Sequence, residues 1–217
     1  ALAAYFGWQW WQGKERGDAE AASNVYQGFV EAVSANEGKP DNKQLTTAQS
    51  LARELKDDHA KRVYAAQASL QLAALAAEKN DLETAAKELQ WVVDNSGDDA
   101  LKHIATRRLA AVKAARGETN EALALLKGDV PPAFAALFAE TRGDILVQQG
   151  DKDAARAAYQ EARAQLLPEQ AGGSRVLDLK IEGLGEAPQD ADDNAQHEPA
   201  AEEAENTSEA ETEKDAQ

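Results

Sequence analysis

Apolar residues recur at steps of three and four along most of this chain, with polar residues between them. This spacing is typical of helices that bury one face. It predicts helices over 18–36, 44–57, 59–79, 82–95, 99–116, 119–126, 132–149 and 152–167. Loops with Gly or Pro separate several of them, and Pro131 and Pro132 cannot both lie inside a helix. The expected fold class is therefore all-α, with about eight helices.

A short phrase occurs three times between these helices: NDLETA at 80–85, GETNEA at 117–122 and GDKDAA at 150–155. Each copy begins with a residue that tolerates positive φ, continues with an acidic residue and ends in Ala. Helical pairs that recur at about 34 residues are typical of tetratricopeptide repeats. Since one pair cannot bury its apolar face alone, we expect a tetratricopeptide-like solenoid of stacked helical pairs over 13–170.

The chain changes character after Pro168. Residues 171–185 contain Gly172 and Gly173 near their start and are predicted to be a linker followed by a short C-terminal extended segment. The extended segment is expected because Leu177, Leu179 and Ile181 alternate with charged residues. The extended segment would pack along the last helix or offer its edge to another chain. Residues 186–217 contain no Val, Ile, Leu or aromatic residue and are predicted to be an acidic disordered tail.

The first twelve residues, ALAAYFGWQWWQ, carry no charged side chain and are rich in aromatics. Tyr5, Trp8, Trp10 and Trp11 are expected at a membrane–water interface, because such rings have an apolar body and a polar edge. Twelve residues are fewer than the roughly 20 that span a bilayer. Residues 1–12 are therefore predicted to be the C-terminal end of a transmembrane helix that begins before Ala1. The alternative is an N-terminal helix whose aromatics pack on the bundle.

The composition argues against several function classes. The chain has no Cys, which excludes disulfides and thiolate chemistry, and its net charge of −16 lies mostly in 186–217 and disfavours nucleic acid. The three His have no metal-binding spacing, and no phosphate-binding Gly loop occurs. The acidic pairs at 57–58 and 98–99 are expected to cap helix starts rather than to form a catalytic pair. We expect no enzyme activity and no cofactor.

Aligning the repeats on Asn80, Gly117 and Gly150 places equivalent positions of the first helix of each pair on the inner wall of the solenoid. This mixed apolar and charged set is predicted to bind a protein partner. It comprises Gln67, Leu70, Ala74, Ile104, Arg107, Ala111, Leu137, Glu140, Asp144 and Gln148. The alternative is that a short solenoid closes on itself, so that this wall is core.

The order of segments over roughly 1–185 resembles the YfgM-like family of ancillary SecYEG translocon subunits. The resemblance is carried by WQWWQ, NVYQGFVEAV, WVVDNSGDDALKHIATRRLAAVKAARG, AALFAETRGDILVQQGDKDAARAAYQEA and LDLKIEGL. It implies a single-pass protein of the bacterial inner membrane with its helical domain in the periplasm and no catalytic residues.

The implied partners are the SecYEG translocon, the chaperone PpiD and translocating polypeptides, which an adaptor of this kind would help transfer to periplasmic chaperones. The acidic tail exceeds the family pattern. Two other functions stay open from the residues alone. One is a scaffold or assembly factor for another envelope complex, and the other is a structural oligomer that exchanges the LDLKIEGL strand.

Overall fold

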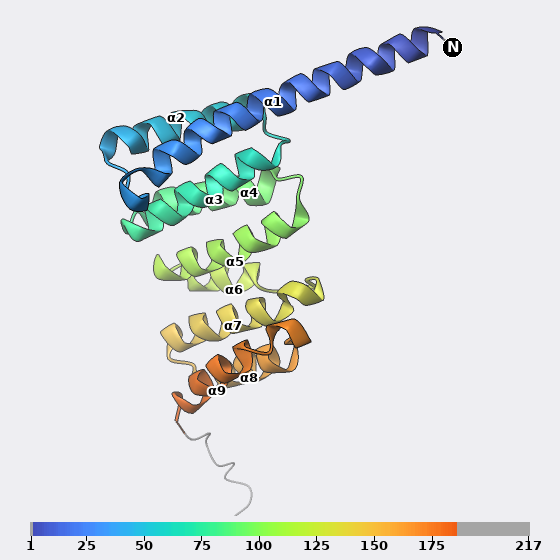
Figure 1. The fold of residues 1–217 in the computed structure, drawn as a ribbon. Helices are drawn as coiled ribbons and strands as arrows, with labels where there is room; N and C mark the ends of the chain where they lie inside the picture. Colours follow the sequence, from blue (N-terminus) through green and yellow to red (C-terminus); the bar gives the residue numbers. More distant parts are fainter. Residues whose placement is uncertain (1, 186–217) are drawn as a thin grey trace, which may run out of the picture. The chain divides into compact units, whose positions relative to one another are not determined.

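The computed structural model describes the backbone of residues 2–185 and the side chains of Tyr5 and of residues 8–185; the predicted acidic tail, 186–217, lies outside the described residues. All regular structure within 2–185 is helical (Figure 1). The α-helices are α1 (Leu2–Gly38), α2 (Asn42–Asp58), α3 (Val63–Glu78), α4 (Leu82–Asn95), α5 (Asp99–Ala115), α6 (Thr119–Leu125), α7 (Pro132–Gln149), α8 (Lys152–Ala164) and α9 (Gly173–Glu182), with a 3-10 turn, η1, at Pro168–Gln170.

The helices form stacked pairs in chain order. α1 packs on α2, α3 on α4, α5 on α6 and α7 on α8, and the second helix of each pair also contacts the first helix of the next. The first helices α1, α3, α5 and α7 contact one another in succession and face the viewer in Figure 1. α9 packs on α8 as the first helix of a fifth pair would. The predicted tetratricopeptide-like fold is confirmed.

The repeated phrase forms the turn within three of the pairs. Asn80, Gly117 and Gly150 have φ of 58°, 83° and 82°, the left-handed conformation that ends a helix. In two copies the acidic residue that follows caps the next helix: Asp81 accepts from the backbone N–H of Thr84 at 3.1 Å, and Asp151 accepts from that of Ala154 at 3.0 Å. The final residues of the three copies, Ala85, Ala122 and Ala155, are fully buried.

Among the described glycines, Gly143 of α7 has the tightest surroundings. A Cβ atom there would overlap the ring of Tyr159 on α8, which is 3% exposed. The Tyr159 hydroxyl donates to Asp144 Oδ1 at 2.8 Å. The ring therefore fills the space that the missing side chain leaves, and its polar end has a partner.

The predicted C-terminal extended segment is wrong, because residues 173–182 form α9. Leu177 and Leu184 are buried and Ile181 packs beside them, so the apolar residues that matter are spaced by four and three. Leu179, which completed the apparent alternation, is 55% exposed. A lone strand would leave its backbone hydrogen bonds unmade, whereas a helix satisfies its own. The segment that a structural oligomer would exchange as a strand, LDLKIEGL, is thus mostly helical in this chain.

The predicted start of the first helix at residue 18 is also wrong. α1 runs from Leu2 without interruption until the backbone leaves helical values at Ala35. Figure 1 shows its N-terminal part continuing past the end of α2. Tyr5, Trp8, Trp10 and Trp11 are 54–70% exposed, so these four side chains are not packed into the bundle core. Within residues 2–185 no helix combines the length and hydropathy that crossing a membrane requires.

An ion-pair cluster joins α1 to the turn between α2 and α3. Asp18 contacts His59 Nδ1 and Arg62 Nε, each at 2.6 Å. Arg62 Nη2 also donates to the carboxylate of Glu15 at 2.9 Å and to its backbone carbonyl at 3.0 Å. The hydrogen bond from Arg62 holds the pKa of Asp18 below its usual range. These contacts hold residues 59–62 in a turn, so α3 begins at Val63 rather than at His59.

Adding a methyl group at Gly143 tests whether the Tyr159 ring sets the spacing of α7 and α8. In the wild-type chain, Gly143→Ala is expected to lower the free energy of unfolding by about 1–3 kcal/mol, because it overpacks a tight contact. In a Tyr159→Ala background, which itself costs about 3–5 kcal/mol, the same change is expected to raise it by up to about 1 kcal/mol, because Ala favours helix over Gly. Urea unfolding of the four proteins measures the coupling.

Gly28→Ala is the matched control for this cycle. A Cβ at Gly28, inside α1, would lie at an ordinary 3.4 Å from Leu51 Cδ1. Its effect is expected to be the same with and without the Tyr159 ring. Equal effects of Gly143→Ala in the two backgrounds would contradict the close contact.

The ion-pair cluster predicts the point at which α1 becomes protected from exchange. In Arg62→Ala, amide hydrogen exchange of residues 15–21 is expected to accelerate about tenfold, because charge-assisted hydrogen bonds hold this turn to the α2–α3 connection. Protection from Ala22 onward should persist, since Ala22 is the first fully buried residue of α1 among those whose side chains the structure describes. Lys61→Ala, a change at the exposed neighbour, is the control. Unchanged exchange in Arg62→Ala would show that the cluster does not hold α1.

Candidate partner-binding surface

The predicted inner wall is an accessible surface. Ala74, Ala111, Leu137 and Gln148 are exposed, on three successive first helices. Partly exposed positions lie between them: Gln67, Ile104, Arg107, Glu140 and Asp144. Leu70 differs, because it is 9% exposed and belongs to the core between α3, α4 and α5. The alternative that the whole wall is core is therefore wrong, although it holds for Leu70.

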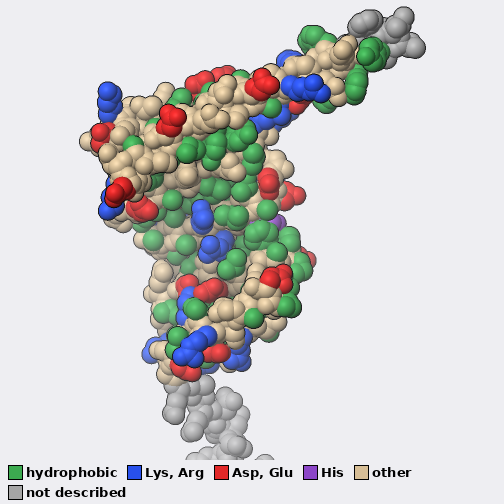
Figure 2. Space-filling model, viewed as in Figure 1, with side chains coloured by type: hydrophobic (Ala, Val, Ile, Leu, Met, Phe, Trp, Pro, Cys, Tyr) green, Lys and Arg blue, Asp and Glu red, His purple; other side chains and the backbone are tan. Residues whose placement is uncertain are grey.

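Figure 2 shows the face formed by the first helices. Hydrophobic side chains gather over the middle of this face with basic side chains among them, and acidic side chains lie over α1 and α2 as well as nearer to α7 and α9. The middle of the face is therefore its least acidic part. Glu140 and Asp144, which were predicted to bind a partner, belong to α7.

Both carboxylates are already bound by α9. Lys180 Nζ lies 2.7 Å from Glu140 Oε1 and 2.6 Å from Asp144 Oδ1, and it also lies over the Tyr159 ring at 5.4 Å. Sequence reasoning missed Lys180 because it placed this residue on the polar side of a strand. Helical spacing would have found it: Lys180 comes three residues after Leu177 and four before Leu184, on the buried side of α9.

Lys180, Glu140, Asp144 and Tyr159 form one cluster, called the Lys180 cluster here. Its two donors, Tyr159 and Lys180, keep their protons at neutral pH. Burial raises the pKa of Tyr159 well above its usual range, and the hydrogen bond to Asp144 raises it further. Burial lowers the pKa of Lys180, but its hydrogen bonds to Asp144 and Glu140 together raise the pKa above the ordinary lysine value. Tyr159 and Lys180 therefore both donate to Asp144, and the cluster ties α7, α8 and α9 together.

Arg107, unlike Glu140 and Asp144, has no ion-pair partner among the described residues, and its side chain makes one hydrogen bond. Its Nη1 donates to Thr141 Oγ1 at 3.4 Å, and the Thr141 hydroxyl donates to the Leu137 carbonyl at 2.8 Å. Burial, and then the neighbouring charge of Arg108, lower the pKa of Arg107, which stays charged because arginine titrates far above neutral pH. Among the described residues, no carboxylate lies within ion-pair distance of its guanidinium.

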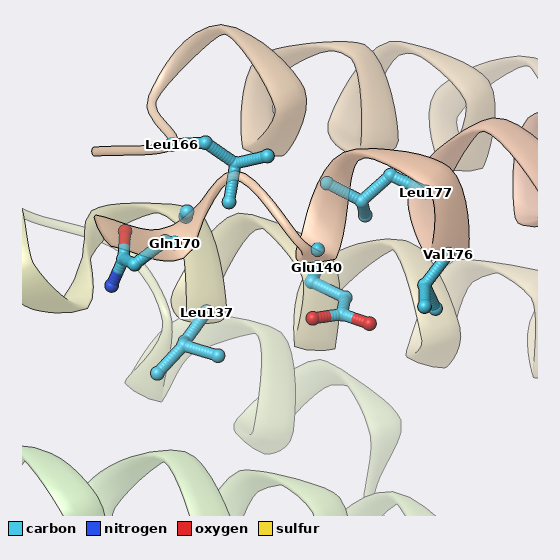
Figure 3. Close-up of a pocket in the computed structure, with 8 residues that line it drawn as sticks. Leu137, Glu140, Leu166, Gln170, Val176 and Leu177 are labelled. Atoms are coloured by element: carbon cyan, nitrogen blue, oxygen red, sulfur yellow. The ribbon is translucent and has the colours of Figure 1, made fainter. Parts of the chain in front are cut away.

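A pocket of about 260 Å³ lies between α7 and the segment that runs from the end of α8 to α9 (Figure 3). Most of its lining is apolar. The lining residues are Ala136, Leu137, Glu140, Leu166, Gln170, Gly173, Val176 and Leu177. A more open hollow of about 350 Å³ lies on α1 and α3, lined by Val33, Ser34, Gly38, Gln71, Ala74 and Leu75.

The part of the chain that the structure describes holds no candidate metal centre. It contains no group of three or more His, Asp or Glu side chains placed to hold a metal ion. His59 pairs with Asp18, and the His103 ring packs 5.0 Å from that of Phe134. Asp98 caps α5 as predicted, but residues 57–58 end α2 and do not begin a helix.

Comparisons with known proteins agree with this architecture. Residues 1–186 match a family model described as a tetratricopeptide repeat-like domain. A curated protein of Escherichia coli K12 named ancillary SecYEG translocon subunit is 35% identical over 184 residues, 84% of each chain. This chain belongs to the YfgM-like family.

Other relatives carry the same printed name. The protein of Haemophilus influenzae Rd is 32% identical over 164 residues, which are 75% of this chain and 76% of the relative. The protein of Neisseria gonorrhoeae FA 1090 is 27% identical over 184 residues, 85% of each chain. No solved structure matches this YfgM-like chain significantly.

The Lys180 cluster predicts how firmly α9 is held. Lys180→Met is expected to lower the free energy of unfolding by about 1–3 kcal/mol, because it removes the donor of Glu140 and one of the two donors of Asp144. Lys87→Met is the control, since the Lys87–Glu83 pair is exposed and lies within one helix. It should cost less than about 0.5 kcal/mol. Urea unfolding of both variants measures the difference, and equal losses would contradict the structural role of Lys180.

The same variant makes a prediction about pH. Folding raises the pKa of Lys180. The contribution of Lys180 to the free energy of unfolding is therefore fully present below about pH 10.4, the pKa of an unfolded lysine. The contribution is lost as the pH rises through the higher folded value. The stability gap between wild type and Lys180→Met should therefore stay constant from pH 7 to 9 and narrow above about pH 10.5. If the difference in the free energy of unfolding between the two proteins stays constant above about pH 10.5, Lys180 is not the protonated donor of this cluster.

Proposed function

We propose that this chain is a non-enzymatic adaptor subunit of the SecYEG translocon that binds other proteins through the inner wall of its repeats. The observation that carries the proposal is 35% identity, over 84% of both chains, to the Escherichia coli ancillary SecYEG translocon subunit. An accessible wall of stacked first helices supports a binding function, because such surfaces present many side chains from rigid elements.

We also propose that a membrane anchor leads into α1, with the repeats in the periplasm. The exposed rings of Trp8, Trp10 and Trp11 on one end of α1 support an interfacial position. The ion pairs of Asp18 and Glu15 with Arg62 would fix the direction of that end relative to the repeats. A tether of this kind raises the local concentration of the repeats at the translocon, so a modest intrinsic affinity would suffice.

The finer partner assignment follows from the family resemblance. PpiD and translocating polypeptides would meet the repeats on the periplasmic side, and the adaptor would help to transfer translocated proteins to chaperones. The inner wall suits such transfer, because mixed apolar and charged surfaces with shallow hollows bind segments weakly enough to release them.

Site-specific photocrosslinking tests the wall. A crosslinking amino acid at Ala74, Ala111 or Gln148 of the complete protein, in inner-membrane vesicles that contain SecYEG and PpiD, is expected to capture a translocon subunit or PpiD. These three positions are exposed on α3, α5 and α7. They do not disturb the Lys180 cluster.

Lys87 on α4 and Ala157 on α8 are the control positions, since both are exposed on second helices. They should crosslink at least fivefold less. Equal crosslinking from the two sets would reject the inner wall as the binding face. No crosslink to SecYEG or PpiD from any position would reject the adaptor function.

A further inference from the structure

We propose that the part of the inner wall formed by α5, α7 and α9 binds an extended polypeptide segment in which a bulky apolar side chain lies close to a carboxylate. The apolar side chain enters the α7–α9 pocket, and the carboxylate binds Arg107. This inference rests on the proposed function, since it names the chemistry of the segment that the inner wall takes.

The pocket has the size and lining for one apolar side chain. Its volume of about 260 Å³ is below the roughly 300–1,000 Å³ of pockets that hold small-molecule ligands. Leu137 and Val176 at its rim are 39% and 49% exposed. Covering these two side chains would remove apolar surface from water, which favours association.

The polar side chains of the pocket already have partners. The Glu140 carboxylate binds Lys180 Nζ. Gln170 accepts from the backbone N–H of Leu167 at 3.1 Å and donates to the Ala133 carbonyl at 3.0 Å. A polar side chain entering the pocket would lose its hydrogen bonds to water and find few free partners there beyond the second oxygen of Glu140. An apolar side chain has no hydrogen bonds to water to lose.

Arg107 provides the charged half of the site. A guanidinium has five N–H donors, and Arg107 makes one long hydrogen bond, to Thr141, among the described residues. The nearby carboxylates of Glu140 and Asp144 are held by Lys180 instead. The Arg107 guanidinium therefore keeps N–H donors for a carboxylate of the partner segment, to which it is complementary in charge.

The two halves are close enough for one short segment to reach both. Arg107 contacts the Thr141 hydroxyl, which donates to the carbonyl of Leu137, and Leu137 lines the pocket. The guanidinium thus lies within about one helical turn of the rim. An extended chain rises about 3.3 Å per residue, so residues one to three positions apart can make both contacts.

Binding of defined peptides to the complete chain tests this chemistry. The probe is a fluorescein-labelled nonapeptide of Gly and Ser that carries one Leu and, two residues later, one Glu, with both ends blocked. One matched peptide has Lys for Glu, and another has Ala for Leu. Fluorescence anisotropy is expected to give a Kd about tenfold lower for the Leu–Glu peptide than for either of the others.

Protein variants assign each contact. Arg107→Glu is expected to reverse the preference, so that the Leu–Lys peptide binds more tightly than the Leu–Glu peptide. Arg108→Glu, the same charge change at the exposed neighbour, should keep the wild-type preference. If Arg107→Glu does not fold by circular dichroism, Arg107→Gln replaces it and should abolish the preference.

A second pair of variants tests the pocket. Leu137→Gln should raise the Kd of the Leu–Glu peptide about fivefold. Val147→Gln is the control, because Val147 lies on the same helix, is 41% exposed and is outside the pocket lining. It should have no effect.

Equal affinity for the Leu–Glu and Leu–Lys peptides would overturn the inference, and so would equal effects of Arg107→Glu and Arg108→Glu. Either result would leave the proposed adaptor function intact, because photocrosslinking from Ala74, Ala111 and Gln148 tests that function without reference to peptide chemistry.

Discussion

Close packing at small residues is the constraint on which this structure depends. Helices can approach to the roughly 8–10 Å of a tetratricopeptide stack only where the side chains at the crossing are small. Ala48, Ala85, Ala122 and Ala155, one on each second helix, are all fully buried. Gly143 is the extreme case, because even a methyl group there would overlap the Tyr159 ring. Each copy of the repeated phrase ends in one of these alanines, which lies at the beginning of the second helix of its pair, just after the turn.

A stack built this way has unfinished ends, because every pair relies on its neighbours for part of its core. At the C-terminal end, α9 takes the place of a further first helix and buries Leu177 and Leu184 against the last pair. Lys180 then fixes α9 to Glu140 and Asp144. Capping the stack thus places one positive charge beside two carboxylates of the inner wall.

The N-terminal end serves a different purpose. The core residues of α1 begin at Ala22, and the helix continues beyond them toward Leu2 with exposed Trp side chains. Arg62, in the turn before α3, reaches Asp18 and Glu15 and so holds the helix at the point where it leaves the core. The aromatic end and the inner wall are parts of one connected helical unit, as the proposed function at a membrane requires.

The sequence by itself determined the fold class, the presence of eight helices in four pairs and the turns within three of those pairs. Helical periodicity and turn chemistry are local properties, so contiguous residues such as GDKDAA encode them completely. The tertiary structure decided the rest. Residues 173–182 fit a two-residue period and a helical period equally well over so short a length, and packing on α8 selected the helix. Lys180 and Asp144 lie 36 residues apart, and His59 and Asp18 lie 41 apart. Such pairs form only when stacking brings distant helices together, and they determine which charges of the inner wall stay available to a partner.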